Sequence, residues 1–492
     1  DGAQGADISA IPSIALKQVE VLRDGAAAQY GSDAIAGVMN FILKDAAEGG
    51  SFEVKYGQYS EGDGDQMTYS GNIGMPFTDD GFANFSFEYG NTDPTDRSVQ
   101  RNDAAGLIAA GNTDVANPAQ VWGQPEVKDD LKLMMNLGLD IGGGREAYAH
   151  GNYASKEVEG GFYFRNPNTR GAVFSNDGGV TRLVGDLTED GSGNCPVVAV
   201  GDDAAMAQVM ADPNCFIFNE LFPGGFTPKF GGKTTDFAGT AGVRGTMENG
   251  WNWDISAGVG RHQADFFIKN TVNASLGPNT PTAFDPGAYT QLDKTFNVDM
   301  SKGFDVGFAS DLNVAGGFEW RNEQFEITVG DAASFEIGPL AEQGFSAASN
   351  GFSGFSPLAG GKWSRSNVAM YLDLEANVTE DLLVGVAVRW EDFDDFGTTT
   401  NGKIAGHYTV NDMVSLRATY STGFRAPTPG QSNAFNVSTE FDSATNDLVN
   451  NGFVPPTNPA SVLKGGKALQ PEDSTNYTAG IIMQLGDVDL TI

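Results

Sequence analysis

Apolar and polar side chains alternate with a period of two along most of the chain. In the segment FANFSFEY at residues 82–89, Phe85, Phe87 and Tyr89 fall on one side of the backbone and polar residues on the other. This alternation predicts a strand with one apolar and one polar face. About 15 such strands follow one another from Ser51 to the last residue, which predicts an all-β fold with one large antiparallel sheet. Further examples lie at residues 251–260, 368–378, 382–392 and 414–421.

The connections between the predicted strands alternate between short and long. Tight turns at one rim and long loops at the other are the layout of a transmembrane β-barrel of the outer-membrane type. A barrel of about 15 strands or more encloses a lumen too wide for its own side chains to fill. Short connections are expected at 78–81, 142–145, 248–250, 379–381, 410–412 and 486–489, and long polar ones at roughly 91–130, 165–235, 270–293, 330–365 and 424–474.

The start of the chain has a different pattern. Residues 18–44 contain a short apolar strand, the turn signal Asp24-Gly25, a stretch rich in alanine and glycine, and a second apolar run at 38–43. The small residues allow close packing of backbone against backbone. Because a wide, empty lumen would make an outer membrane leak, we expect the residues before Lys44 to form the end of a plug inside the barrel.

Composition excludes some functions. The formal net charge is -35, so binding to nucleic acid is not expected, because phosphates would be repelled. The sequence has no run of 18 apolar residues that could form a membrane-spanning helix. It also has no phosphate-binding loop and no nucleophile motif, so we expect neither an enzyme nor a cofactor. The chain starts at Asp1 without a signal peptide and stops within a predicted strand, so we expect a fragment.

Three segments resemble a known family. ALKQVEVLRDGAAAQYGSDAIAGVMNFILK, at 15–44, looks like the C-terminal plug motif of TonB-dependent outer-membrane receptors. Residues 387–427, ending in GFRAP, resemble barrel strands of that family. LQPEDSTNYTAGI, at 469–481, resembles a third family element, with Ala479 where the family usually has glutamate. The three matches occur in the family's order and extend from the plug to the last residues of the chain.

The resemblance implies a domain organisation and a location. Residues 1–46 would be the C-terminal part of the plug domain, and residues 47–492 a transmembrane barrel truncated at its C-terminus. About 15 strands would be present of the 22 that such barrels have. The protein would lie in the outer membrane of a Gram-negative bacterium, in contact with outer-membrane lipid. Its other partner would be an inner-membrane TonB-type energy-transducing complex, engaged through an N-terminal box that this sequence does not contain.

The family also implies a function, namely energy-coupled uptake of a scarce nutrient. A ferric siderophore complex is the default ligand, and cobalamin, haem or an oligosaccharide are alternatives. A passive porin-like channel is a second hypothesis, but it would need no plug. A secreted β-rich binding protein or hydrolase is a third, but its loops would not alternate in length.

Two charged residues of the predicted plug strand are candidates for contact with the barrel. In the family that the motif resembles, an arginine at the position of Arg23 pairs with glutamates of the barrel wall. Glu20 is the second candidate, because a buried charge needs a partner. Period two predicts that Leu372, Leu374, Val386 and Val388 face lipid and that Asp373, Glu375 and Arg389 face the lumen.

The two cysteines, Cys195 and Cys215, lie 20 residues apart in the longest predicted loop. In an oxidising compartment they would form a disulfide, and two unrelated thiols are the alternative. His150, His262 and His407 lie far apart on predicted strands, so no metal site is expected. Aromatic residues of the predicted loops are candidates for ligand contact: Trp122, Phe222, Phe226, Phe352, Phe355 and Trp363.

Overall fold

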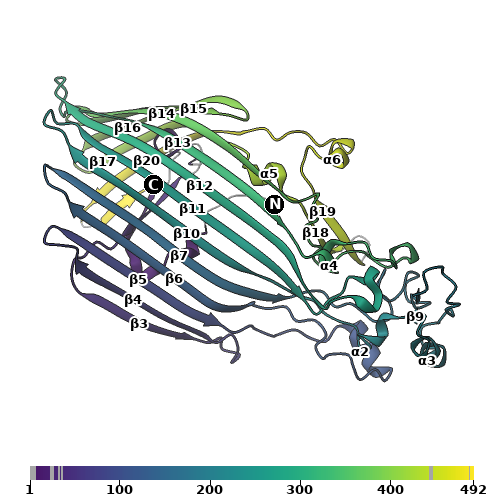
Figure 1. Ribbon diagram of the computed structural model, residues 1–492. Coiled ribbons are helices and arrows are strands. Elements are labelled where there is room, and N and C mark those ends of the chain that lie inside the picture. The colour runs from purple at the N-terminus through teal and green to yellow at the C-terminus, as the bar shows by residue number, and fades with distance from the viewer. Residues whose placement is uncertain (1–6, 23–26, 32–33, 35–36, 443–446, 487) are drawn as a thin grey trace.

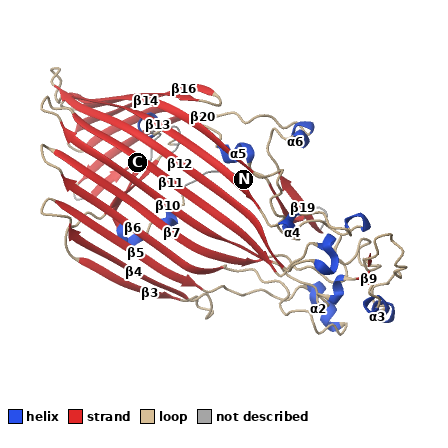
Figure 2. Ribbon diagram, viewed as in Figure 1, coloured by secondary structure: helices blue, strands red, loops and turns tan. Residues whose placement is uncertain are grey.

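The chain folds into one large curved sheet with a small N-terminal segment on its concave side and lobes of loops at one end (Figures 1 and 2). The computed structural model describes residues 7–22, 27–31, 34, 37–442, 447–486 and 488–492. Among the described residues, no helix has the length and apolar character needed to cross a membrane.

The large sheet has 15 strands, and every adjacent pair is antiparallel, as the alternation in the sequence predicts. Each strand pairs with the nearest sheet strand before and after it in the chain, so β3 and β21 form the two edges. The strands are β3 Gly50–Gly57, β4 Gln66–Pro76, β5 Gly81–Thr92, β6 Glu126–Asp140, β7 Arg145–Gly161, β10 Lys229–Thr246, β11 Asn252–Lys269, β12 Ala283–Phe304, β13 Leu312–Val329, β14 Gly361–Thr379, β15 Leu382–Phe393, β16 Gly397–Asn411, β17 Val414–Arg425, β20 Glu472–Leu485 and β21 Val488–Thr491.

The two rims of the sheet differ as expected. Tight turns lie at the left in Figure 1 and the long loops at the right. The turn between β12 and β13, at 305–311, was missing from the predicted set, because its residues carry no break in polarity that separates them from the flanking strands. The long connections are 93–125, 162–228, 270–282, 330–360 and 426–471.

The long loops contain their own short elements. These are α2 Asn102–Ala109, β8 Gly185–Asp186, α3 Asp203–Ala211, β9 Cys215–Phe216, η3 Phe218–Glu220, η4 Ala274–Asn279, α4 Ala332–Phe335, η5 Ala341–Gln343, α5 Pro429–Asn433, β18 Asn436–Asp442, β19 Asp447–Phe453 and α6 Pro459–Leu463. The largest hydrophobic cluster of the loops joins residues 173–226 to residues 272–274 and 340–345. The loops are therefore packed against one another and hold a core of their own.

The N-terminal segment consists of η1 Ile8–Ala10, η2 Ser13–Ala15, β1 Leu16–Leu22, α1 Ala27–Tyr30 and β2 Val38–Leu43. β1 and β2 form a two-stranded antiparallel sheet, as the two apolar runs predict. η1 packs on β7 and η2 on β4 and β5, while α1 packs on β14, β15, β16 and β17. The described part of this segment therefore touches the large sheet on two distant sides.

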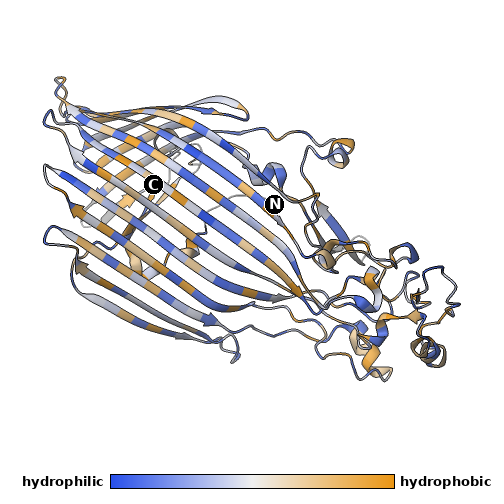
Figure 3. Cartoon of the chain, in the orientation of Figure 1, coloured by the Kyte–Doolittle hydropathy of each residue, from blue (hydrophilic) through white to orange (hydrophobic). Residues whose placement is uncertain are grey.

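The two faces of the strands are those that period two predicts. Leu372, Val386 and Val388 are exposed on the convex face, and Leu374 is half-buried there. Arg389 is almost fully buried on the inner face, opposite Tyr371 on β14. Asp373 and Glu375 lie two and four residues along β14 from Tyr371, so they share this inner face. Figure 3 shows the same alternation along the other strands.

Candidate functional site

The first part of the candidate site is the region where the N-terminal segment contacts the inner wall of the sheet. Tyr30 and Gly31, at the end of α1, line a small polar cavity with charged side chains of β13, β14 and β15. Gly31 has a φ of +95°, and a β-carbon there would lie 3.6 Å from the guanidinium of Arg389. A residue without a side chain is therefore suited both to this backbone conformation and to close contact with the wall.

The wall beneath α1 is a network of ion pairs. Arg389 lies 3.0 Å from Glu319 and 3.1 Å from Glu391. Arg365 lies 2.5 Å from Glu323 and also donates to the backbone carbonyl of Pro427. These arginines are buried, and a buried charge is tolerated only with close partners of opposite charge. The closest charged partners of both arginines, Glu319, Glu323 and Glu391, belong to the large sheet, so these two cations are paired within the wall.

Two further contacts hold the segment on the opposite side of the lumen. Lys156 of β7 donates to the hydroxyl of Ser9 at 2.9 Å and lies 3.5 Å from Asp7. Asn136 of β6 donates to the carbonyl of Lys44 at 3.0 Å. The segment is thus bound at its start and at its end to β6 and β7, in addition to the α1 contacts on β14–β17. This agrees with the expectation that residues before Lys44 pack inside the barrel.

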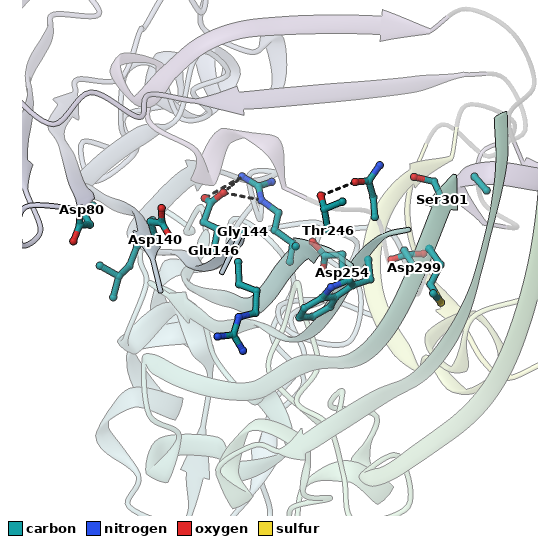
Figure 4. A pocket seen from close by; sticks show the side chains of 18 of the residues that line it. Asp80, Asp140, Gly144, Glu146, Thr246, Asp254, Asp299 and Ser301 are labelled. Atoms are coloured by element: carbon teal, nitrogen blue, oxygen red, sulfur yellow. Dashed lines mark hydrogen bonds and ion pairs between the residues drawn. The ribbon is translucent and has the colours of Figure 1, made fainter. Parts of the chain in front are cut away.

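A large cavity lies on the inner wall near the tight-turn rim and forms the second part of the candidate site. Its volume is about 760 Å³. Carboxylates from several strands line it, among them Asp140, Glu146, Asp254 and Asp299 (Figure 4). Its lining holds five carboxylates and two arginines, so this part of the wall carries more negative than positive charge. One of the arginines, Arg244, forms an ion pair with Glu146 at 2.9 Å.

Asp254 and Asp299 oppose each other directly across the β11–β12 pair. Like charges in such positions repel. Tyr148 donates to Asp254 at 2.7 Å, and Tyr371 donates to Asp299 at the same distance. Each tyrosine hydroxyl therefore supplies hydrogen-bonding stabilisation to one of the two carboxylates. The arrangement favours cationic groups over anionic ones along this wall.

The hydrogen bonds that the structure describes for Glu20 lie within the N-terminal segment, and its contact with the barrel stays a prediction. The Glu20 carboxylate accepts hydrogen bonds from Gln18 at 2.6 Å and from Asn40 at 3.1 Å. The β1–β2 register places Asn40 directly opposite Glu20, so the carboxylate is satisfied within the two-stranded sheet. Arg23 lies outside the described residues, and its pairing stays a prediction.

Five of the six aromatic ligand candidates pack into two hydrophobic clusters at the long-loop end of the sheet, and Trp363 among them lies on β14. Phe226, Phe352 and Phe355 are buried, and Phe222 and Trp363 pack against the same two clusters. Such residues stabilise the loops, because burying aromatic area there gives the loops a core. Trp122 differs, since it is 48% exposed and rests edge-on against Tyr163. Trp122 is therefore the most exposed of the six.

Cys195 and Cys215 form a disulfide, with Cα atoms 5.6 Å apart. The bond links the 186–195 turn to β9, next to a small core that includes Val198, Val209 and Ile217. It therefore closes the outermost lobe of the 162–228 loop.

The histidines do not come together. His262 pairs with Asp236 at 2.7 Å, and His150 and His407 lie on other strands. Within the ranges that the structure describes, no group of three or more His, Cys, Asp and Glu side chains is arranged to hold a metal ion.

Sequence reasoning missed several residues of the site: Arg365, Glu319, Glu323 and Glu391 beneath α1, and Asp254, Asp299, Tyr148 and Tyr371 in the cavity. All of them occupy inward positions of their strands, so alternation alone could have placed them on the inner wall. Their pairing depends on the register between strands, which the alternation within one strand does not contain.

Comparisons with known proteins agree with this architecture. A family model described as "TonB dependent receptor-like, beta-barrel" matches residues 212–492, and one described as "TonB-dependent Receptor Plug Domain" matches residues 1–38. A protein of Acinetobacter baumannii described as "Probable TonB-dependent siderophore receptor PirA" is 23% identical over 502 residues, which cover 99% of this chain and 54% of that protein.

Solved structures of two receptors have the same fold. The siderophore receptor PirA from Acinetobacter baumannii aligns with a TM-score of 0.58 at 16% identity, over 99% of this chain and 58% of that one. A mutant of the ferric enterobactin receptor PfeA from Pseudomonas aeruginosa aligns with a TM-score of 0.59 at 14% identity, over 98% of this chain and 58% of that one. The chain thus spans somewhat more than half the length of these relatives. Together, the barrel match over more than half of the sequence and the plug match place the chain in the family of TonB-dependent receptors, whose members are transport receptors of the outer membrane.

Proposed function

We propose that this chain is part of an outer-membrane receptor that imports a ferric siderophore by energy-coupled transport. Residues 1–46 would be the end of its plug and residues 47–492 part of its barrel, and it would have no catalytic role. The observation that carries the proposal is the N-terminal segment bound to opposite sides of the inner wall, by α1 on β14–β17 and by Lys156 and Asn136 on β7 and β6. A passive channel would not need this obstruction.

The ion pairs of the wall beneath α1 support a plug that can move away from the wall. Arg365 and Arg389 pair with glutamates of the wall itself. Displacing α1 would leave Arg365 and Arg389 with these glutamate partners, so neither arginine would become an unpaired buried charge, which is costly. The work of displacement has to come from elsewhere, because the outer membrane has neither ATP nor an ion gradient. An inner-membrane complex of the TonB type is the partner that this role requires.

The choice of a ferric siderophore as ligand is supported by the relatives, since PirA is named a siderophore receptor and PfeA a ferric enterobactin receptor. Cobalamin, haem and oligosaccharides are the alternative ligands. On this chain, Trp122 is the candidate for ligand contact, because its ring is exposed on one of the long loops.

The test is transport by the full receptor, expressed in a Gram-negative strain that lacks its own siderophore receptors. Uptake of radiolabelled iron is measured for a panel of ferric siderophores, with labelled cobalamin, haem and an oligosaccharide as the alternatives. We expect uptake of at least one ferric siderophore, and we expect it to stop when the energy-transducing complex is deleted. Uptake that persists without that complex would favour the passive channel, and uptake of cobalamin or haem alone would identify another ligand.

A further inference from the structure

The convex face of the sheet carries an apolar band that is expected to contact the membrane interior. Phe237 on β10, Val259 on β11 and Phe296 on β12 belong to it and are 51%, 38% and 39% exposed. Neighbouring residues on the same strands face the lumen, as His262 does in its pair with Asp236. The alternation visible in Figure 3 therefore separates a lipid-facing set from a lumen-facing set.

Two basic residues stand at the edge of this band nearest the long loops. Arg261 follows Val259 on the outer face of β11 and lies opposite Phe237 on β10. Lys294 precedes Phe296 on the outer face of β12 and lies opposite Val259. Both side chains are exposed. Leu292 opposes Arg261 and lies two residues from Lys294, so the two cations are diagonal neighbours, about 7 Å apart at their backbones.

These two cations differ from others on the outer face at the same end of the sheet. Lys362 pairs with Glu326 at 3.2 Å, Lys128 pairs with Glu126 at 2.8 Å, and Lys229 and Lys269 share Glu159. Arg261 instead donates to the amide oxygen of Gln263. For Lys294, the described part of the chain shows no ion pair.

The residues directly across from Arg261 and Lys294 carry no negative charge, and Asp265, four residues along the outer face of β11 from Arg261, accepts a hydrogen bond from Gln263. The register places Phe237 and Leu292 beside Arg261, and Val259 and Asn322 beside Lys294. None of these is acidic, although the protein has 64 Asp and Glu against 29 Lys and Arg. Two adjacent cations without a carboxylate directly opposite them, at the edge of an apolar surface, favour a negative partner from outside the chain.

An apolar groove begins next to this pair. It runs over the outer face of β3, β4, β5, β6, β7 and β10, has a volume of about 570 Å³, and is lined by Tyr153, Phe237 and Gly239 among others. Phe237 is the direct cross-strand neighbour of Arg261, so the groove ends beside the cations. A β-carbon on Gly239 would meet other atoms only at 3.9 Å, which leaves the groove open at this point.

We infer that Arg261 and Lys294 bind the phosphate of a lipid in the outer leaflet and that an acyl chain of the same lipid lies in the groove. Phosphate accepts charge-assisted hydrogen bonds from both a guanidinium and an ammonium group, and the groove offers hydrocarbon contact beside Arg261. This site requires placement in an outer membrane, but it does not depend on which nutrient the receptor transports.

The experiment uses the full receptor purified in detergent and two probes, a diphosphorylated glucosamine acyl lipid and its dephosphorylated form. Binding is measured by native mass spectrometry. We expect the wild type to prefer the phosphorylated lipid by about tenfold, and the R261Q/K294Q double variant to lose this preference. Lys362→Gln is the matched control, because Lys362 already has a carboxylate partner, and it should bind as the wild type does.

Two further arms identify the binding partner. Gly239→Leu would place a side chain in the groove, and we expect it to weaken binding of both lipids while the double variant weakens only the phosphorylated one. Millimolar inorganic phosphate should not compete. Equal binding by the wild type and the double variant would overturn the inference, as would an equal loss in Lys362→Gln, no effect of Gly239→Leu, or full competition by free phosphate. Each variant is first checked for folding by its heat-dependent shift in gel electrophoresis.

Discussion

The hydroxyl of Tyr371 donates a 2.7 Å hydrogen bond to Asp299 across Gly317, the residue that faces both of them in the sheet. Replacing Tyr371 by Phe removes this donor and leaves Asp299 opposite Asp254 without it. We expect a loss of about 1–3 kcal/mol in the free energy of unfolding. Thermal unfolding in detergent measures it, with Tyr408→Phe on the outer face as control. Equal stability of the two variants would contradict the assigned role of the hydrogen bond.

Gly317 itself should resist substitution. A β-carbon at this position would overlap the carboxylate of Asp299 and come within 2.6 Å of the Tyr371 ring and 2.8 Å of the carbonyl of Val298. Gly317→Ala is therefore expected to cost about 1–3 kcal/mol through displacement of these groups. The matched control is Gly385→Ala on β15, where the nearest atom lies 3.6 Å away, and this variant should unfold at the wild-type temperature. The prediction fails if Gly317→Ala and Gly385→Ala unfold at the same temperature.

Removal of the disulfide should destabilise one lobe and spare the barrel. A covalent loop of this size contributes about 3 kcal/mol by chain-entropy estimates. In the double variant C195S/C215S we expect rapid proteolysis between residues 186 and 215, while the heat-dependent gel shift of the barrel stays unchanged. A lowered unfolding temperature of the barrel would show that the lobe supports the sheet as well.

Acid should loosen the turn at Asp177. The Asp177 carboxylate accepts hydrogen bonds from the Thr181 hydroxyl, the amides of Thr181 and Val180, and the Ser175 hydroxyl. These bonds, the Thr181 hydroxyl foremost, lower the pKa of Asp177 below its ordinary value of 3.8. Because the folded pKa is the lower one, the stabilisation is present above pH 3.8 and is lost progressively as the pH falls from 3.8 toward and through the folded pKa.

Hydrogen exchange at the amides of Val180 and Thr181 tests this pH dependence between about pH 6 and pH 3. After correction for intrinsic rates, protection should fall toward the acid end in the wild type. Asp177→Asn should be less protected throughout and should lack the pH dependence. A wild-type profile that is flat over this range would be evidence against the mechanism.

The wall beneath α1 should control the seating of the plug. Arg389→Met removes a buried cation and leaves Glu319 and Glu391 without it, which is expected to cost about 3–5 kcal/mol locally. In planar bilayers we expect the full receptor with this change to show frequent openings that the wild type lacks. The double variant R389M/E391Q should partly restore closure, because it removes one of the two carboxylates that Arg389 pairs with in the wild type. If neither the wild type nor the Arg389→Met variant shows openings, this cluster does not control how the plug is held in the barrel.

Features set by the residues of one strand, such as its position in the chain and the direction of its side chains, could be predicted from the sequence. The side of each strand on which Leu372 or Arg389 lies follows from period two, and the two strands around residues 18–43 follow from apolar runs separated by a turn signal. The opposition of Asp254 and Asp299 could not be predicted, because a shift of one residue between β11 and β12 would have placed different pairs together.

The ligand candidates show a second limit of sequence reasoning. Phe352 and Phe355 looked available for a ligand because they lie in a long polar loop, yet they pack against inward aromatic residues of the strands such as Phe266 and Tyr289. A hydrophobic residue in a loop indicates a ligand contact or a loop core equally well, and only tertiary packing separates the two. Trp122 stays exposed because its neighbour Tyr163 covers one edge of its ring alone.

The pairing of every strand with its neighbours in the chain has a consequence for how the receptor can diversify. The three residues between β15 and β16 and the long stretch 162–228 between β7 and β10 close the same kind of antiparallel pair. The entropy of closing a loop grows only with the logarithm of its length, so a connection roughly twenty times longer costs only about 3 kcal/mol more. Loops with their own cores can compensate for that difference. Insertions at the long-loop rim therefore change the stability of the barrel little. New binding specificities can arise there while the register of the strands is kept.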